Sequence, residues 1–175
     1  MVNGRQKGAA AEREISKLLA DELGEEFGLS FKRDLEQYRE GEHGDLVCSD
    51  PSFPFVLEIK RFKSGCAAQP KWWDQCCAAA RAETERRRVL RPDAPNKLPL
   101  LVYKYNHQQW KWRMPAEAVM RAGLPHGNMG MREDAELDWG YAVEMDTRTA
   151  MMIVRELLAD AVSVSSVEGV NVKEL

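Results

Sequence analysis

The sequence predicts an α/β fold in which helices flank a central mixed β-sheet. Two observations support this fold class. Apolar residues recur at three- and four-residue spacing near both ends of the chain, which is typical of amphipathic helices. Between them lie short apolar or alternating runs separated by glycine and proline, which is typical of strands joined by turns. With 175 residues, 44% of them hydrophobic, the chain is long enough to form one domain with a buried core.

The first half of the chain is predicted to form one helix and three strands. An apolar stripe from Ala11 to Leu23 predicts the helix, and Gly24 is its predicted end. A polar loop with two glycines separates the first two strands, and Pro51 and Pro54 mark a turn that makes a hairpin of the last two. The helix is predicted at 5–23, the strands at 29–34, 45–49 and 55–61, and the loop at 35–44.

The second half begins with a stretch rich in alanine, arginine and glutamate, which predicts a helix. Two strands follow a proline-rich loop, and Pro115 opens a short helix. "WGYAVEMD" predicts a last strand, and an apolar stripe after it predicts a last helix, with a frayed tail from Val162. The predicted helices cover 71–88, 115–122 and 147–159, the strands cover 98–106, 108–114 and 139–146, and 123–138 is predicted to be irregular. The domain core is thus expected at about 5–122, with a strand–helix extension at about 139–160.

The charge distribution is compatible with a nucleic-acid partner. Residues 1–121 carry 21 Lys and Arg against 18 Asp and Glu, whereas residues 122–175 carry 4 against 10. The overall net charge of −3 therefore comes from the C-terminal third. No run of residues has the length and hydrophobicity of a membrane span, and the N-terminus lacks an apolar signal-peptide centre, so we expect a cytoplasmic protein without membrane contact. The four cysteines lack zinc-site spacing and are expected to be reduced.

The stretch "GDLVCSDPSFPFVLEIKRFKSG" carries the chemistry of the chain. Side chains alternate along a strand, so Glu58 and Lys60 share one face with Val56, and we expect that face to be accessible. The neighbouring residues Phe55, Leu57 and Ile59 face a core. The predicted hairpin brings Asp45 beside Glu58, so that two carboxylates converge at one point.

Two adjacent carboxylates repel each other unless a cation lies between them. Mg²⁺ binds carboxylates, a backbone carbonyl and water, so Asp45, Glu58 and the Ile59 carbonyl are its candidate ligands, and Mn²⁺ is expected to substitute. Lys60 is placed to orient an attacking water or to neutralise phosphate charge, which is the chemistry of metal-assisted phosphodiester hydrolysis. The alternative reading of the same residues is a set of surface charges on an edge strand.

The spacing of Gly-Asp, twelve residues and Glu-x-Lys resembles the PD-(D/E)xK nuclease motif, with glycine in place of proline. "KGAAAEREISKLL" resembles the opening helix of the archaeal-type Holliday junction resolvases. "FKRD" resembles the basic strand that follows that helix, and "LPLLVYKYNHQQWKWRMPAE" resembles their paired later strands. The resemblance covers most of residues 5–120 and implies the restriction-endonuclease-like fold of this superfamily.

The resemblance also implies roles for individual residues. Asp45 and Glu58 fall on the metal carboxylates of the family and Lys60 on its catalytic lysine. Glu12 falls on the helix glutamate that supports the metal site. Arg13 falls on the basic residue beside that glutamate, and Arg33 on the strand arginine that contacts DNA phosphate. Further candidate DNA contacts among the basic residues near this site are Lys7, Lys32, Arg61 and Lys63.

The function implied is a Mg²⁺-dependent endodeoxyribonuclease that cleaves four-way DNA junctions during recombination, acting as a homodimer. The second helix could supply the dimer interface through an apolar surface of four side chains, and core packing is the alternative for the same side chains. Another nuclease of the superfamily, such as a flap, single-strand or exonuclease-like enzyme, stays open, as does a non-catalytic DNA-binding protein on the same fold. The four side chains of the second helix that are the candidate dimer interface are Trp72, Trp73, Cys76 and Cys77.

Overall fold

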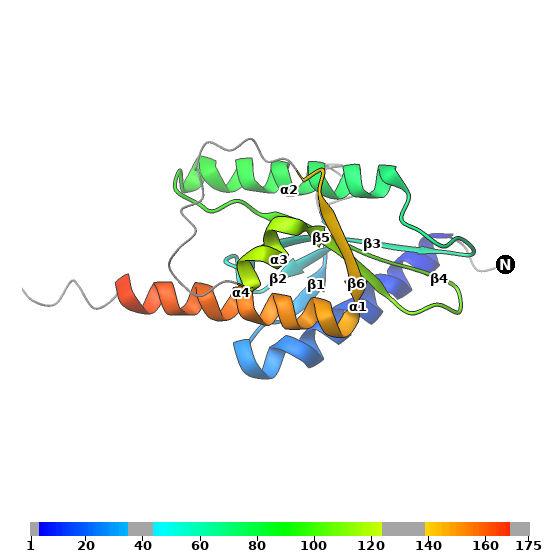
Figure 1. Ribbon diagram of the computed structural model, residues 1–175, viewed down its shortest axis with the longest axis horizontal. Helices are drawn as coiled ribbons and strands as arrows, with labels where there is room; N and C mark the ends of the chain where they lie inside the picture. Colours follow the sequence, from blue (N-terminus) through cyan, green and yellow to red (C-terminus); the bar gives the residue numbers. More distant parts are fainter. Residues whose placement is uncertain (1–3, 35–43, 124–138, 169–175) are drawn as a thin grey trace, which may run out of the picture.

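Six strands and four helices make up the chain in the computed structural model, which describes residues 4–34, 44–123 and 139–168 (Figure 1). The predicted loop at 35–43 and the predicted irregular stretch at 124–138 lie outside these residues. In chain order the elements are α1 (Gly4–Phe27), β1 (Phe31–Arg33), β2 (Leu46–Cys48), β3 (Phe55–Phe62), α2 (Pro70–Leu90), β4 (Leu98–Tyr105), β5 (Lys111–Pro115), α3 (Ala116–Ala122), β6 (Ala142–Asp146) and α4 (Thr147–Glu168). Every element predicted from the sequence is therefore present.

The sheet is mixed, as predicted. Its strand order is β1-β2-β3-β4-β5-β6, and all neighbours are antiparallel except β3 and β4, which are parallel. A parallel pair needs a crossover connection, and α2 provides it between β3 and β4. The hairpin of β2 and β3 is paired at Leu46 and Leu57, so the two strands diverge soon after they meet.

Helices cover both faces of the sheet. Helices α1 and α4 lie on one face, and α2 lies on the other (Figure 1). The larger core packs Ile15 and Leu19 of α1 against Leu57 and Ile59 of β3, together with apolar residues of α4. The smaller core packs α2 against Val56 and the apolar face of β4. Strand β3 is therefore buried on both sides.

The burial of β3 corrects one expectation from the sequence. The strand face that carries Val56 and Glu58 was expected to be accessible, but Val56 is 7% exposed and Glu58 only 1% exposed. The reason is that the first turns of α2 lie over this face. Alternation along a strand separates its two faces, but it does not tell which of them a later helix covers.

The apolar surface of α2 corrects a second expectation. Trp72, Trp73, Cys76 and Cys77 are 2%, 7%, 0% and 5% exposed within a single chain. They pack against the sheet rather than facing solvent, and the Trp73 indole N–H donates to the Trp139 carbonyl at 3.1 Å. The prediction that they form a dimer seam is wrong for this reason, and core packing is confirmed.

Several element boundaries also differ from the predicted ones. Helix α1 continues through Gly24, and the residue after its last turn is Gly28, whose φ of 66° is the left-handed conformation that commonly ends helices. Strand β5 begins at Lys111, and His107 in the turn before it has a φ of 64°. Helix α4 continues past Val162 to Glu168. Among the residues that the structure describes, no helix has both the length and the hydrophobicity to cross a membrane.

A buried lysine holds the turn between β2 and β3. Lys97 is 5% exposed, and its Nζ donates to the carbonyl of Pro51 at 2.7 Å and to the carbonyl of Phe53. The Lys97 backbone N–H donates to Thr84 Oγ1 on α2 at 2.9 Å. One residue thus connects the β2–β3 turn, α2 and the start of β4. Burial, and next the charge of Arg87, lowers the pKa of Lys97 to about 8.

Replacing Lys97 with Met should lower the free energy of unfolding by about 1–3 kcal/mol, because two buried carbonyls lose their donor. Chemical denaturation of both proteins measures this difference, and Lys17→Met on the exposed side of α1 serves as the control. A loss no larger than that of the control would show that the turn does not depend on Lys97.

The difference in free energy of unfolding between the wild-type protein and Lys97→Met should grow as the pH rises. Because the folded-state pKa of Lys97 is about 8 and its ordinary value is 10.5, the unfolded chain binds more protons between these pH values. The wild-type protein should therefore gain stability relative to Lys97→Met across this window. A difference in unfolding free energy that shrinks with rising pH would contradict the lowered pKa.

Candidate active site

Asp45 immediately precedes β2 and is fixed to β3 by two hydrogen bonds. Its backbone N–H donates to the Leu57 carbonyl at 2.7 Å, and its Oδ2 accepts from the Ile59 N–H at 2.5 Å. The carboxylate therefore takes the place that a backbone carbonyl would have if β2 continued along β3. This contact places Asp45 beside the residue that precedes Ile59, which is Glu58.

The glycine before Asp45 has a steric reason. A Cβ at Gly44 would lie 2.8 Å from the Leu57 carbonyl oxygen and 2.8 Å from Val56 Cγ1, so a side chain does not fit there without moving β3. Glycine lets the backbone of β2 approach β3 closely enough for the Asp45 hydrogen bonds. The Gly-Asp pair of the motif is thus one structural unit.

Glu58 and Lys60 lie on the α2 side of β3, as the strand alternation predicts. The Lys60 Nζ forms an ion pair with Glu58 Oε1, and the two side chains are 21% and 2% exposed. Lys60 therefore covers the outer end of a buried carboxylate and reaches solvent itself. The predicted trio of Asp45, Glu58 and Lys60 comes together at one place, where β2 and β3 begin to diverge.

Burial and repulsion govern the electrostatics of this trio. Burial, and next the charge of Glu58, raises the pKa of Asp45 to about 7, against an ordinary value of 3.8. Burial also raises the pKa of Glu58, although Lys60 acts against the shift. Both carboxyl groups are costly to ionise where they stand, and a positive charge between them would relieve that cost.

Glu12 is next to the site but engages a different partner. It is 7% exposed on α1, and its Oε2 forms an ion pair with Arg33 Nε on β1. Ser16 strengthens the same contact between α1 and β1, because its hydroxyl donates to the Phe31 carbonyl at 2.7 Å. The charge of Glu12 contributes to raising the pKa of Asp45, but it is the smallest of the causes. The structure therefore places Glu12 and Arg33 together as a pair that borders the site.

Glu14 is a functional candidate that sequence reasoning missed. Its Oε1 accepts from Lys104 Nζ at 2.7 Å and from the Trp110 indole N–H at 2.8 Å, and its Oε2 faces Arg61 at 3.4 Å. The three partners lie on β4, on the turn before β5 and on β3. Nothing in the spacing of the sequence links them to Glu14, because they meet only when α1 packs on the sheet. Arg61 is thus held on the α1 side of β3, opposite Lys60.

The remaining predicted DNA contacts are distributed over this end of the molecule. Arg13 is exposed on α1, between Glu12 and Glu14, and Lys32 is exposed on β1 beside Arg33. Lys63 is exposed just after β3, and Lys7 is half-buried in the second turn of α1. The structure gives each of these residues access to solvent but brings none of them into the trio.

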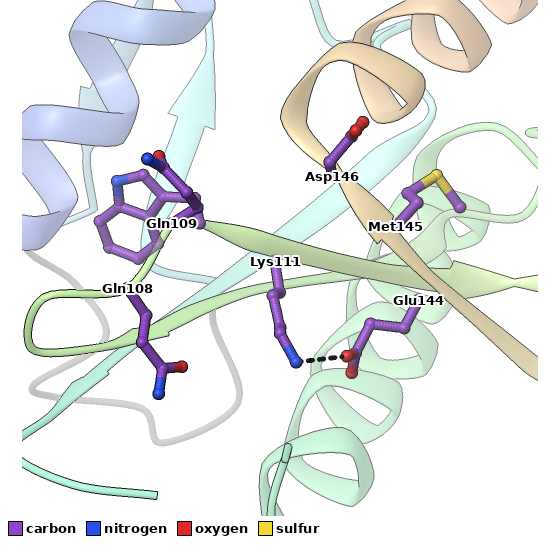
Figure 2. A pocket seen from close by; sticks show the side chains of 7 residues that line it. Gln108, Gln109, Lys111, Glu144, Met145 and Asp146 are labelled. Carbon is purple, nitrogen blue, oxygen red and sulfur yellow. Dashed lines mark hydrogen bonds and ion pairs between the residues drawn. The ribbon is translucent and has the colours of Figure 1, made fainter. Parts of the chain in front are cut away.

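Two of the surface cavities that the described residues form differ in their relation to the trio. One, of about 460 Å³, is lined by residues at the facing ends of β5 and β6, where Lys111 pairs with Glu144 at 3.1 Å (Figure 2). None of the predicted site residues lines it. The other, of about 500 Å³, is lined by Gly44 and Val56, which lie close in sequence to Asp45 and Glu58, and by Lys97. None of the three residues of the trio lines it.

The oxygen donors at the trio suit a hard divalent cation. Two carboxylates from neighbouring strands and the carbonyl of Ile59 are the ligand types that Mg²⁺ and Mn²⁺ use, with water in the other positions. Within residues 4–34, 44–123 and 139–168, no three Asp, Glu, His or Cys side chains gather as a metal-binding group. The candidate ligands at the trio are therefore two carboxylates and a carbonyl, and Glu12 is paired with Arg33.

The fold and the trio define a class of protein. A mixed sheet flanked by helices, with the Asp of one strand beside the Glu-x-Lys of the next, is the arrangement of the PD-(D/E)xK nucleases. Residues 3–161 match the family described as "Phage putative PDDEXK endonuclease", and the chain belongs to that family. This membership confirms the fold class and the nuclease resemblance inferred from the sequence.

The structure is also similar to that of Hjc, a Holliday junction resolvase from the archaeal hyperthermophile Archaeoglobus fulgidus. The sequence identity is 15%, the TM-score is 0.40, and the alignment covers 61% of this chain and 74% of that chain. A comparison with curated proteins gives no match.

Replacing Asp45 with Asn should stabilise the protein in the presence of a chelator. The change removes one of two neighbouring buried carboxylates, while the amide oxygen can still accept from the Ile59 N–H. We expect the free energy of unfolding at mildly alkaline pH to rise by about 1–3 kcal/mol, measured by chemical denaturation.

Asp50→Asn is the matched control for this measurement. The Asp50 carboxylate accepts from the Ser52 N–H at 2.7 Å, and hydrogen bonding to Ser52 lowers its pKa. Removal of this charge should therefore leave the stability unchanged or lower it. If Asp45→Asn behaves in the same way, the two buried carboxylates do not strain the fold.

Proposed function

We propose that the protein is a metal-dependent endodeoxyribonuclease that hydrolyses phosphodiester bonds in branched DNA, with four-way junctions as its principal substrate. The single observation that carries the nuclease chemistry is the convergence of Asp45, Glu58 and Lys60 at the point where β2 leaves β3. The family to which the chain belongs supports the same reaction class.

In this proposal Asp45 and Glu58 hold Mg²⁺ together with the Ile59 carbonyl, and Mn²⁺ substitutes for it. When bound, the cation makes water a better nucleophile and offsets negative charge on the phosphate. Lys60 stands beside Glu58 at the solvent side of the site, where its Nζ orients the attacking water or the phosphate oxygens. The water oxygen bonds to phosphorus as the bond from phosphorus to the leaving sugar oxygen breaks.

The preference for four-way junctions rests on the ordered match of the N-terminal helix, Arg33 and the Asp…Glu-x-Lys residues to the archaeal-type resolvases. Symmetric resolution of a junction needs two cuts, so the proposal includes a homodimer with one site in each chain. The interface lies elsewhere than on the apolar face of α2, because that face is buried within each chain.

The chemistry is tested by Asp45→Asn and Glu58→Gln. Each should reduce single-turnover cleavage of a four-way junction by at least about a thousandfold, because the metal loses a ligand, while junction binding is kept or strengthened. In addition, Mg²⁺ should raise the melting temperature of the wild-type protein more than that of either variant. Cleavage at the wild-type rate in either variant would remove these residues from the active site.

The substrate class is tested with the same wild-type protein on four-way, flap, single-stranded and linear duplex DNA. Fastest cleavage of the four-way junction supports the proposal. Faster cleavage of flap or single-stranded DNA would make the protein another structure-selective nuclease of this fold. Junction binding without cleavage of any DNA in Mg²⁺ or Mn²⁺ would make it a binding protein.

The role of Arg33 is tested through the salt dependence of DNA binding. Contact with one phosphate releases about 0.9 counterions, so Arg33→Ala should flatten the slope of log affinity against log salt by about that amount for DNA of any shape. Glu12→Gln provides the matched comparison, because it keeps Arg33 but removes its ion-pair partner. A slope that Arg33→Ala leaves unchanged would assign Arg33 to the α1–β1 contact alone.

A further inference from the structure

The α2-facing side of β3 emerges from the core along its length. Val56 and Glu58 are 7% and 1% exposed, Lys60 is partly exposed, and Phe62, the last residue of the strand, is 42% exposed. These four residues alternate along one strand, so Phe62 stands on the same face as Glu58 and Lys60. The distance between successive residues on one strand face puts the Phe62 Cα about 7 Å from that of Lys60.

The Phe62 ring is held in a fixed orientation. It stacks on the indole of Trp72, with the ring centroids 4.7 Å apart and an interplanar angle of 27°. Trp72 is itself buried and packs against Tyr103 and Tyr105, at centroid distances of 5.9 Å and 6.1 Å. One side of the Phe62 ring therefore rests on an aromatic cluster, while 42% of the residue stays exposed.

The chain after Phe62 is held against Tyr105. A Cβ at Gly65 would lie 2.2 Å from the Tyr105 ring, and the Tyr105 hydroxyl donates to the Ala67 carbonyl at 2.7 Å. The Gln108 amide also donates to the Gly65 carbonyl at 3.1 Å. These contacts fix the loop between β3 and α2 to the end of β4, while Phe62 keeps its exposure.

Three lysines lie close to Phe62 or to its stacking partner along the chain. Lys60 precedes it on the same face, Lys63 follows it and is exposed, and Lys71 is exposed next to Trp72 at the start of α2. An exposed aromatic ring among lysines fits a nucleic acid better than an apolar protein surface, because the lysines attract phosphate and the ring accepts the face of a base.

We propose that Phe62 is a stacking platform for an unpaired nucleobase next to the scissile phosphate. This inference rests on the proposed nuclease function and deepens it, because it names the feature of the substrate that the site recognises. A base within a continuous duplex already stacks on its neighbours and cannot offer a face to Phe62. The preferred substrate is therefore DNA in which a base within reach of Lys60 is unpaired or can leave its stack, as at the opened centre of a four-way junction, a bulge or a strand end.

Binding measured in a chelator tests the inference without cleavage. The probes are a duplex with one extra unpaired base and the same duplex fully paired. Phe62→Ala and Phe62→Leu should each weaken binding to the unpaired probe about tenfold, and to the paired probe by less than about twofold, because leucine keeps the contact with Trp72 but has no ring. Phe62→Trp should restore binding to within about twofold of the wild type.

Met152→Ala is the matched control, because Met152 is an apolar side chain on α4 with 57% exposure and is not part of the site. Melting temperatures confirm that each variant is folded. If Phe62→Ala does not fold, Phe62→Leu alone tests the inference. If Phe62→Leu binds the unpaired probe as tightly as the wild type does, or loses the same affinity for both probes, the stacking role of Phe62 is overturned. The proposed nuclease function would not be affected by either result. A wild-type protein that binds neither of these probes nor a four-way junction would overturn the proposed function as well.

Discussion

The hydrogen bond from the Ile59 N–H to the Asp45 carboxylate is the contact on which the site depends. It ends the pairing of β2 with β3, because a side-chain oxygen occupies the place of a backbone carbonyl. It also draws one carboxylate toward a second one that α2 already covers. The unfavourable proximity of the two charges and the local geometry of the sheet are thus consequences of one interaction, which Gly44 makes sterically possible.

The sequence was sufficient for the elements and for the trio, because both depend on local patterns. Alternation placed Glu58 and Lys60 on one face, and the short connection between β2 and β3 brought Asp45 to them. What local patterns do not contain is the identity of the packing partner. A helix with Trp72 and Trp73 on one stripe can cover a sheet or another chain, and only the tertiary structure shows that it covers Glu58.

The basic residues near the site also show which properties local patterns predict and which only the tertiary structure reveals. Their types and positions predicted affinity for phosphate, but not that α1 supplies carboxylates to several of them. Glu12 pairs with Arg33, and Glu14 contacts both Arg61 and Lys104. Each pair joins residues from different elements, at a separation that no periodicity encodes. Helix α1 therefore orients the positive side chains as well as supporting the sheet.

The parallel pairing of β3 with β4 has a consequence for the order in which the chain folds. Phe55 pairs with Leu98, and all of α2 lies between them in the sequence, so this pairing requires closure of a long segment. Contacts between distant residues form slowly compared with those in helices and hairpins. The cover over Glu58 comes from α2, and the turn before β3 is anchored by Lys97 at the start of β4. A nascent chain that has not yet been synthesised through β4 therefore lacks both the cover over Glu58 and the anchor of the turn before β3, so the candidate site assembles late.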